Sequence, residues 1–526
     1  MKKIKLLDCT LRDGGYVNNW HFGEENIKNI IKKLNQSNID IIECGFLRDD
    51  VAECGSEYSN FKSVQDLINL DPSLFSDNKQ YALMVLAEKY DINHLVVKDQ
   101  PYIDTIRLSF HKRDIRKAIE MAKAIKDKGY ELFLQPTATM RYNDDEIKEL
   151  IFICNNEIKP KSIAIVDTFG EMVGDDIIHY AELFDEYLDK KISLSFHSHN
   201  NLQTAYSNAI LFMEHVCSDR EIVIDSSVYG MGRGAGNLCD ELIVNYLNRK
   251  YGKDYNLFPI LEIADNILSD IKKRNYWGYS LEYYLSAIHH CHPNYCIYFS
   301  NKNTLTTFDL AKIVELISED KRTDFDQDYA LGLYQSYNNR KRVDEDDYNQ
   351  LKQKIGNRKV ILIGPGKSIV HNQKKISKYV NNKSEYYSIS VNVETLFDTD
   401  AIFLSNRKRG YEMNHFREKD YLLTSNVDIQ INHAMVFDYC DNLAKELKIS
   451  DNSLLVLLNI LKKVSISEIL LAGFDGFSIE QDNNYCDKKL VYMIDANRIE
   501  ELNATLKSYI QLYQKNLNLK FLTKSK

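Results

Sequence analysis

Eight short apolar runs recur along the first 230 residues, and this rhythm constrains the fold more than any other feature of the sequence. The runs are 4–9, 39–46, 81–87, 104–110, 131–136, 162–167, 192–199 and 221–227. Polar segments with helical spacing, such as 24–35 and 114–128, lie between most of them. Strands that alternate with helices are typical of a parallel sheet built from βα units. Eight such units predict a closed (β/α)8 barrel in preference to an open doubly wound sheet.

The chain has 526 residues, more than one compact core holds, and a second α/β region begins near residue 359. There KVILIGPGKSI predicts a buried strand, a glycine turn and a helix start, and further strands are expected at 401–406, 421–426 and 468–477. We therefore predict an α/β protein with three parts. They are a barrel domain with a helical extension over 1–300, a charged helical linker over 301–358, and a Rossmann-like α/β domain over 359–526.

Composition excludes some partners and favours one compartment. The net charge of −9 and the pI near 5.9 indicate no basic surface for nucleic acid. The sequence has no apolar run long enough to cross a membrane and no signal-peptide pattern. Ten cysteines occur without CxxC pairs, as expected of reduced thiols. We therefore expect a cytoplasmic protein that acts on small molecules.

Polar residues gather where the expected strands end, which is where (β/α)8 barrels build their active sites. They are Arg12, Asp13, Glu43, Arg107, Gln135, Asp167, His197, His199 and Asp225. His197 and His199 are two residues apart on a strand, so their side chains point the same way. Asp13 follows the first strand and can reach both histidines, because only one strand lies between their strand and the first. Such an HxH pair also fits two partly buried structural histidines, but opposite the RDGG turn (12–15) it favours a divalent metal on Asp13, His197 and His199.

That metal gives Arg12 and Glu43 a chemical role. A keto acid that chelates a metal becomes acidic at the carbon beside its carbonyl, and an arginine can share the negative charge of the resulting enolate. Glu43 either orients Arg12 or a metal-bound water, or forms a structural ion pair with Arg12.

A glycine-rich segment, GMGRGAGN (230–237), follows the last expected barrel strand. Gly232 and Gly234 allow close backbone approach and can present N–H donors to an anion. Asn237 either bonds a metal-bound water or caps a helix. We expect Gly232, Gly234 and Asn237 to bind substrate together with Arg107 and Asp167.

Five motifs in sequence order carry a family resemblance over residues 1–300: RDGG (12–15), ECGF (43–46), DTFG (167–170), HSHNN (197–201) and GMGRGAGN. They resemble the metal-dependent pyruvate aldolase and lyase superfamily, which includes 3-hydroxy-3-methylglutaryl-CoA lyase and isopropylmalate synthase, and are nearest its 4-hydroxy-2-oxovalerate aldolase branch. The resemblance implies Asp13, His197 and His199 as ligands of Mn or Mg, with Co or Zn as alternatives. It implies Arg12 as the enolate-stabilising residue and Glu43 as the acid of the second strand.

The chain departs from that branch at the residue that moves protons. The branch has an acid–base histidine a few residues after RDG, where this sequence has Tyr16, with His21 further on. Tyr16, His21 or a metal-bound water therefore remain candidates. The RDGEQ of the synthase branch and the loop cysteine of the lyase branch are absent, which disfavours a CoA-thioester substrate.

The second domain contains GPGKS (364–368), which is not a P-loop because Ile361 stands where GxxxxGK[ST] needs glycine. The strand–GPG–helix turn can still bind an anion. With 391–397, 400–409 and 470–477 it resembles sialyltransferase-like Rossmann-type proteins of surface-polysaccharide pathways. This implies a nucleotide or sugar-nucleotide pocket at Gly364, Gly366, Ser368, Asn406 and Asp475; the alternative is a purely structural or oligomerising domain.

Together these features predict a metal-dependent aldolase or carbon–carbon lyase acting on a pyruvate-type enolate and an aldehyde. The second domain suggests a sugar aldehyde and a role in surface-sugar biosynthesis, and a homodimer is plausible for such barrels. Three alternatives stay open: an acyl-CoA-condensing synthase on the same barrel, a sugar-nucleotide-binding or glycosyl-transferring protein with a non-catalytic barrel, and a non-haem iron oxygenase.

Overall fold

The computed structural model describes residues 2–76, 79–217, 219–302, 304–413, 418–444, 451–466, 468–478, 496–514 and 517–525. The chain divides into two compact units. The barrel unit comprises Met1–Cys296 with Ser318–Phe325, and the second unit comprises Ile297–Ile317 with Asp326–Lys526.

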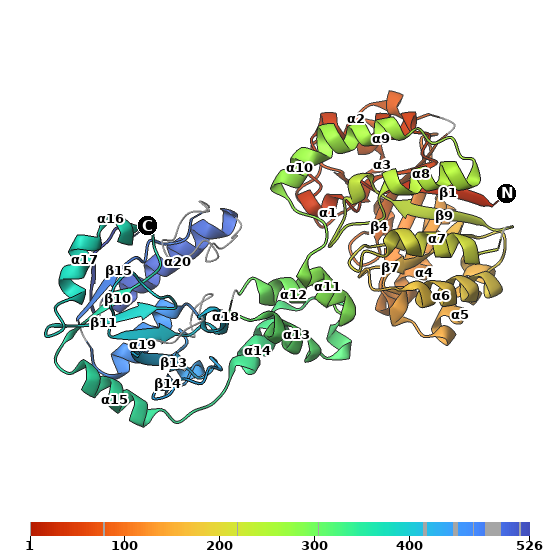
Figure 1. Ribbon diagram of the computed structural model, residues 1–526. Coiled ribbons are helices and arrows are strands. Elements are labelled where there is room, and N and C mark those ends of the chain that lie inside the picture. Colours follow the sequence, from red (N-terminus) through yellow and green to blue (C-terminus); the bar gives the residue numbers. More distant parts are fainter. Residues whose placement is uncertain are drawn as a thin grey trace. The chain divides into compact units, whose positions relative to one another are not determined.

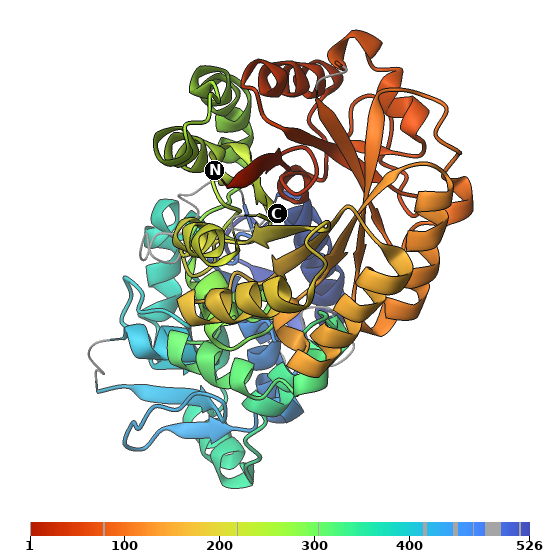
Figure 2. The ribbon, with the colours of Figure 1, turned by 90° about the vertical axis from the view of Figure 1, so that its right-hand side faces the viewer.

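Eight parallel strands of the barrel unit form a closed barrel (Figures 1 and 2), as the sequence predicts. They are β1 (Lys3–Asp8), β2 (Ile41–Leu47), β4 (Gln80–Leu86), β5 (Ile103–Phe110), β6 (Glu131–Pro136), β7 (Ser162–Asp167), β8 (Ser193–Ser198) and β9 (Glu221–Ser226). Pairing of β1 with β2, at Leu7–Ile41 and Asp8–Ile42, closes the ring. The short strand β3 (Asn60–Phe61) adds to the end of β2.

Amphipathic helices cover the outside of the barrel. In α2 (Glu24–Gln36), Ile27, Ile30, Ile31 and Leu34 recur at helical spacing and are buried. The other helices around the barrel are α3 (Val64–Ile68), α4 (Ile115–Asp127), α5 (Asp144–Ile153), α6 (Gly174–Tyr187), α7 (Ala205–His215) and α8 (Asp240–Tyr251), while the short helix α1 (Gly15–Asn18) belongs to the loop after β1. The main core therefore lies between the strands and these helices.

The inside of the barrel changes from apolar to charged along its length. Leu7, Cys9, Ile41, Phe133 and Val223 belong to a small inner apolar cluster. Glu43, Arg107 and Asp225, which occur further along their strands, are buried charged residues. Polar chemistry is thereby placed at the carboxyl ends of the strands.

A helical extension follows the barrel: α9 (Leu257–Ile263), α10 (Ser269–Arg274), α11 (Leu281–Ile288) and α12 (Pro293–Ser300). Residues 318–325 also belong to this unit. His292 N–H donates to the Arg322 carbonyl at 2.7 Å, and Arg141 Nη2 donates to the His290 carbonyl at 2.9 Å. The first bond joins two segments of the extension, and the second holds the extension against the loop that follows β6.

The second unit contains a parallel sheet of seven strands in the order β14-β13-β12-β11-β10-β15-β16. They are β10 (Lys359–Ile363), β11 (Tyr386–Val391), β12 (Ala401–Leu404), β13 (Asp420–Thr424), β14 (Met435–Phe437), β15 (Glu468–Ala472) and β16 (Asn518–Phe521). The sequence predicts β10, β12, β13 and β15. It misses β11, β14 and β16.

Helices accompany this sheet along the chain. They are α13 (Thr307–Glu315), α14 (Gln327–Asn338), α15 (Glu345–Ile355), α16 (Ser368–His371), α17 (Gln373–Val380), α18 (Arg407–Glu412), α19 (Ser453–Lys463) and α20 (Ala496–Gln514). Leucines and isoleucines of α19 are buried almost all round, so this helix is the centre of the second core.

No helix in the described ranges combines the length and the apolar character of a membrane span. The nine cysteines that fall in those ranges are all free thiols.

Candidate active site

Asp13, His197 and His199 come together as the sequence predicts. Asp13 lies in the turn after β1, His197 is in β8, and His199 follows that strand. All three side chains are buried, and potential ligand atoms from each lie within 4.8 Å of one another. The turn is held by N–H groups of Arg12 and Asp13, which donate to the Cys9 carbonyl at 3.1 and 2.8 Å.

Each histidine is oriented by a hydrogen bond at Nδ1. His197 Nδ1 lies 3.1 Å from Asp225 Oδ2, and His199 Nδ1 lies 3.2 Å from the Arg233 carbonyl oxygen. A carboxylate or carbonyl partner at one ring nitrogen fixes the tautomer and leaves the other free to bind a metal. Burial lowers the pKa of His199 to about 4, against the opposing charge of Asp13, so this imidazole is neutral as a ligand must be.

Beneath the cluster, buried arginines and carboxylates alternate in a connected row, which we call the charge ladder. Arg12 donates from Nη1 to Asp13 Oδ1 at 2.6 Å and from Nε to Glu43 Oε2 at 2.7 Å. Arg107 donates to the same Glu43 oxygen at 2.8 Å and also to Asp225. Burial opposes ionisation of Arg12, but Glu43 and Asp13 outweigh it and raise its pKa. Burial likewise opposes ionisation of Asp13, yet Arg12 and the two histidines hold its pKa well below the usual range.

The residues at the cluster fit a divalent cation. Two imidazoles and one carboxylate are a ligand set of first-row metals. Asn237 donates from Nδ2 to Asp13 Oδ2 at 2.9 Å, while its buried Oδ1 has no hydrogen-bond partner among the described residues. The backbone passes so close at Gly232 that a Cβ there would lie 2.4 Å from Asn237 Nδ2 and 2.8 Å from Asp13 Oδ2. Only glycine leaves that space free.

A cavity of about 690 Å³ opens over this cluster. Arg12, Asp13, Tyr16, His197 and His199 line it, as do Gly232 and Gly234. Apolar side chains form part of the wall, namely Phe46, Met84, Leu86, Val166 and Phe169. Charged and aromatic groups from the loops and the extension complete it, namely Lys89, His111, Arg113, Arg233, Tyr283, His292 and Asp324.

Other predicted site residues lie elsewhere or do something else. His21 does not line the cavity; it forms a bridge with Tyr58, and their rings lie 4.9 Å apart. Asp167 accepts backbone N–H groups of Glu171 and Met172 at 2.9 and 3.3 Å, so it caps the loop after β7. Glu43 and Arg107 are fully buried under the cavity.

Sequence reasoning missed most of the charged and aromatic side chains that the loops and the extension bring to the cavity, among them Arg233 and His292. Arg233 stands inside the glycine-rich segment GMGRGAGN. Its guanidinium carbon lies 5.7 Å from the centre of the Tyr16 ring, and its Nη2 contacts His292 Nε2. His292 comes from the extension, whose position over the barrel no local pattern indicates.

The closed (β/α)8 barrel and the buried Asp–His–His cluster at the carboxyl ends of its strands place this protein among the barrels that have a candidate metal site. Residues 3–267, about half of the chain, match the HMGL-like family, and the chain belongs to that family.

Known proteins of related sequence cover mainly this half. The chain is 22% identical over 253 residues to an oxaloacetate decarboxylase of Mycobacterium tuberculosis, covering 47% of this chain and 70% of that protein. It is 25% identical over 277 residues to a 4-hydroxy-2-oxovalerate aldolase of Chloroflexus aggregans, covering 52% and 77%. The solved N-terminal domain of a candidate aldolase from Bacteroides vulgatus is 28% identical with a TM-score of 0.50, covering 56% of this chain and 96% of that one.

Proposed function

We propose that this protein is a divalent-metal-dependent aldolase, a carbon–carbon lyase that joins a pyruvate-type enolate to an aldehyde or cleaves the product. One observation carries the proposal: the Asp13–His197–His199 cluster and the Arg12 guanidinium line the same cavity. A cation site beside a fixed positive charge is what an enolate requires. Similarity to an oxaloacetate decarboxylase and to a hydroxy-oxovalerate aldolase agrees, because both substrates named are 2-keto acids.

Asp13, His197 and His199 would hold the metal, which when bound polarises the keto oxygen as a Lewis acid. Mn or Mg is our first expectation, and Co or Zn our second. In the condensation direction, a base removes a proton from the methyl carbon of the keto acid. That carbon then forms a bond to the aldehyde carbon, and the aldehyde oxygen takes up a proton.

Arg12 stabilises the enolate that forms between these two proton transfers. Its Nε and Nη1 are fixed by Glu43 and Asp13, so the guanidinium does not have to reorganise when charge develops on the substrate. Glu43 and Arg107 act beneath it as positioning residues, since neither reaches the cavity.

Tyr16 is the group we propose as proton donor to the aldehyde oxygen. It lines the cavity, whereas His21 does not. A tyrosine phenol is protonated at neutral pH, and desolvation raises the pKa of Tyr16 further, so the group has a proton to donate. A water held at the metal site would be the base that takes the first proton.

Arg233 indicates the charge of the second substrate. Its backbone contacts two members of the cluster: its carbonyl accepts from His199, and its N–H lies 3.4 Å from Asp13 Oδ2. The side chain faces the cavity and forms no ion pair within the described part of the chain, while neighbouring Arg113 is paired with Asp324. The guanidinium contacts His292 through Nη2 but has no carboxylate partner among the described residues, so its remaining N–H groups favour an anionic aldehyde. An acidic or phosphorylated sugar aldehyde meets this requirement and is consistent with the predicted role in surface-sugar biosynthesis.

The test uses the purified chain with Mn²⁺, labelled pyruvate and a panel of neutral, carboxylated and phosphorylated aldehydes. We expect an aldol adduct by mass spectrometry, with kcat/KM for the best anionic aldehyde at least about tenfold above that for its neutral analogue. In Arg233→Gln that preference should disappear. An adduct that forms from acetyl-CoA and a 2-keto acid, with release of free thiol, would instead support the condensing-synthase alternative.

A further inference from the structure

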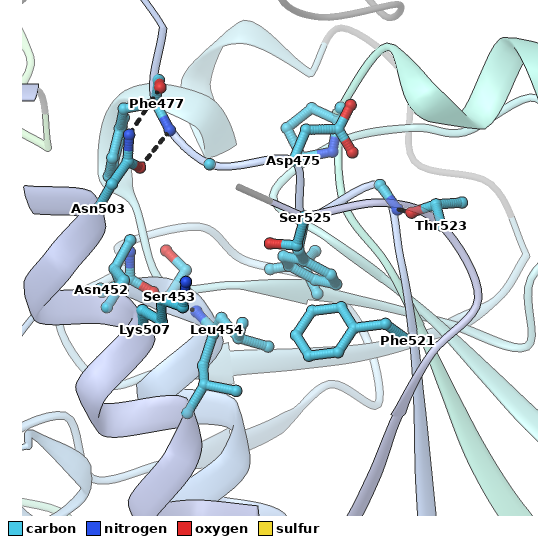
Figure 3. Close-up of a pocket in the computed structure, with 18 of the residues that line it drawn as sticks. Asn452, Ser453, Leu454, Asp475, Phe477, Asn503, Lys507, Phe521, Thr523 and Ser525 are labelled. Atoms are coloured by element: carbon cyan, nitrogen blue, oxygen red, sulfur yellow. Dashed lines mark hydrogen bonds between the residues drawn. The ribbon is translucent and has the colours of Figure 1, made fainter. Parts of the chain in front are cut away.

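The second unit has a cavity of its own, of about 610 Å³, at the carboxyl edge of its parallel sheet (Figure 3). It is lined by residues that follow β10, β11, β15 and β16 and by residues of α19 and α20. β10 pairs with β11 on one side and with β15 on the other, so the chain order reverses there. Ligands of open parallel sheets bind in the crevice at this reversal.

Two glycine loops form the floor of the cavity by crossing closely. Gly364 N–H donates to the Ala472 carbonyl, and Gly366 N–H to the Gly473 carbonyl, each at 2.8 Å. A Cβ at Gly364 would lie 2.7 Å from the Gly473 oxygen, so no larger residue fits the crossing. Ser368 donates its N–H at 2.7 Å, and also its hydroxyl, to the Asp475 carboxylate. These donors are therefore occupied by the protein, and this turn does not cradle a phosphate as a P-loop does.

The residues predicted to bind a nucleotide therefore fall into two groups, those that line the cavity and those that do not. Gly366 and Asp475 line the cavity, while Gly364 and Ser368 support the crossing behind it. Asn406 is the N-cap of α18, where its side chain accepts the Arg409 N–H at 3.2 Å. A ligand must be held mainly by other residues.

Those residues form an apolar wall that side-chain hydrogen bonds hold in place. Leu454, Leu506, Ile510 and the rings of Phe474 and Phe521 line the cavity. Asn503 of α20 accepts the Phe477 N–H at 2.8 Å and donates to its carbonyl at 2.9 Å (Figure 3), which ties the helix to the loop after β15. Thr523 accepts the Gly473 N–H at 3.0 Å. The wall offers aromatic faces on which a planar ring can stack.

Positive charge borders this wall. Lys507 and Lys524 line the cavity and form no ion pair within the described residues, and Arg409 lines it while paired with Glu412. The acidic residue among those described in the lining is Asp475, whose oxygens Ser368 already engages. The cavity therefore suits a ligand with a flat ring and an anionic end.

We propose that this cavity binds a nucleoside phosphate, free or as its sugar ester. The base would pack between Phe521 and the apolar side chains, and the phosphates would face Lys507 and Lys524. A volume of about 610 Å³ is within the ordinary range for cofactor-sized sites. Phosphate recognition here differs from the one predicted from GPGKS, because lysine side chains replace loop N–H groups.

The experiment is isothermal titration of the full-length chain with UDP, CMP and ADP, with pyrophosphate as the anion-only probe and uridine as the ring-only probe. We expect one-to-one binding of at least one nucleotide, tighter than either probe and weakened by salt, because the lysines are exposed. Repeating it with a sugar ester of the nucleotide that binds distinguishes the free nucleotide from its ester.

Variants locate the site. Lys507→Ala should weaken binding at least about fivefold, and Phe521→Leu, which keeps an apolar side chain, at least about threefold. The matched control Lys520→Ala removes a lysine of β16 that pairs with Glu468 outside the cavity, and should change binding less than about twofold. No nucleotide binding up to about 1 mM, pyrophosphate binding as tight as nucleotide binding, or binding that survives both Lys507→Ala and Phe521→Leu would each overturn the proposal.

Discussion

The two units use the same arrangement, parallel strands whose carboxyl ends face a cavity, and fill those ends with different chemistry. In the barrel, Arg12, Glu43, Arg107 and Asp225 form a continuous ladder of buried charges under the Asp–His–His cluster. In the second unit the strand ends carry crossing glycine loops, apolar side chains and lysines at the border.

The difference follows from what each cavity is proposed to do. A site that stabilises developing charge needs fixed charges that do not reorganise, and a buried ladder supplies them. A site that only binds a ligand can rely on apolar contact and exposed lysines, which cost little desolvation. A connected set of buried ion pairs beneath the cavity therefore distinguishes the proposed catalytic unit, whereas the buried arginine that lines the second cavity, Arg409, pairs with exposed Glu412.

The largest effect that this comparison predicts is on metal binding by the barrel. Asp13→Asn removes the charge among the ligands, so Mn²⁺ bound per chain should fall close to zero by elemental analysis. Aldol turnover should fall at least about 10³-fold. Nucleotide binding by the same variant should stay within about twofold of the parent, and a joint loss of both would contradict the separation of roles.

Next in size is the cost of breaking the ladder. Arg107→Met leaves Glu43 and Asp225 buried without their shared partner, and should destabilise the barrel by about 3–5 kcal/mol. The counterpart in the second unit, Asp475→Asn, weakens hydrogen bonds from Ser368 at a partly exposed site and should cost about 1 kcal/mol. Chemical denaturation measures both losses of unfolding free energy, and equal losses would contradict the proposed difference between the units.

Tyr16→Phe tests which group moves the proton, with His21→Phe as its matched control. Loss of the phenol should lower aldol turnover about 10²-fold, with little change in Mn²⁺ affinity, because Tyr16 is not a ligand. His21→Phe should remain within about threefold of the parent, since His21 packs on Tyr58 outside the cavity. The reverse ranking would assign the proton transfer to His21.

The smallest effect concerns a pair of buried carboxyl groups in the barrel, those of Asp8 and Asp240. Burial raises the pKa of Asp8 to about 6, and burial with the charge of Asp8 raises the pKa of Asp240 further. The folded state therefore holds protons that the unfolded chain has lost above about pH 4. Stability should fall as pH rises from about 4 through 6 and beyond.

Asp240→Asn removes one member of that pair. It should stabilise the barrel by roughly 1–3 kcal/mol at pH 8 and flatten this pH dependence. Thermal unfolding between pH 4 and 8 measures it. Unchanged pH dependence in the variant would show that the pair does not share protons in the folded state.

The barrel and its ligand cluster could be predicted because the signals are local. A buried parallel strand is a continuous apolar run, and the two-residue spacing of His197 and His199 places both side chains on the same face of the chain. The role of Asp167 could not be predicted, because a carboxylate at a strand end can face a substrate or accept the loop N–H groups, and only the loop path decides. His21 failed to reach the cavity for the same reason.

In the second unit, local signals were weaker. β14 and β16 are three and four residues long, too short to give a clear apolar period. GPGKS indicates an anion site, yet its N–H groups are taken by a loop more than 100 residues further along the chain. Arg233 and His292 meet over the barrel only through tertiary packing. Residues that define a substrate were therefore harder to predict than residues that define the chemistry.

The most direct test of the central claim is the exchange of pyruvate methyl protons in D2O, followed by proton NMR with Mg²⁺ and without it. It needs no knowledge of the aldehyde. The account predicts metal-dependent loss of the methyl signal that is abolished in Asp13→Asn and retained in His21→Phe. Exchange that persists in Asp13→Asn, or no exchange by the metal-loaded chain even when the anionic aldehyde panel is present, would contradict enolate chemistry at this site.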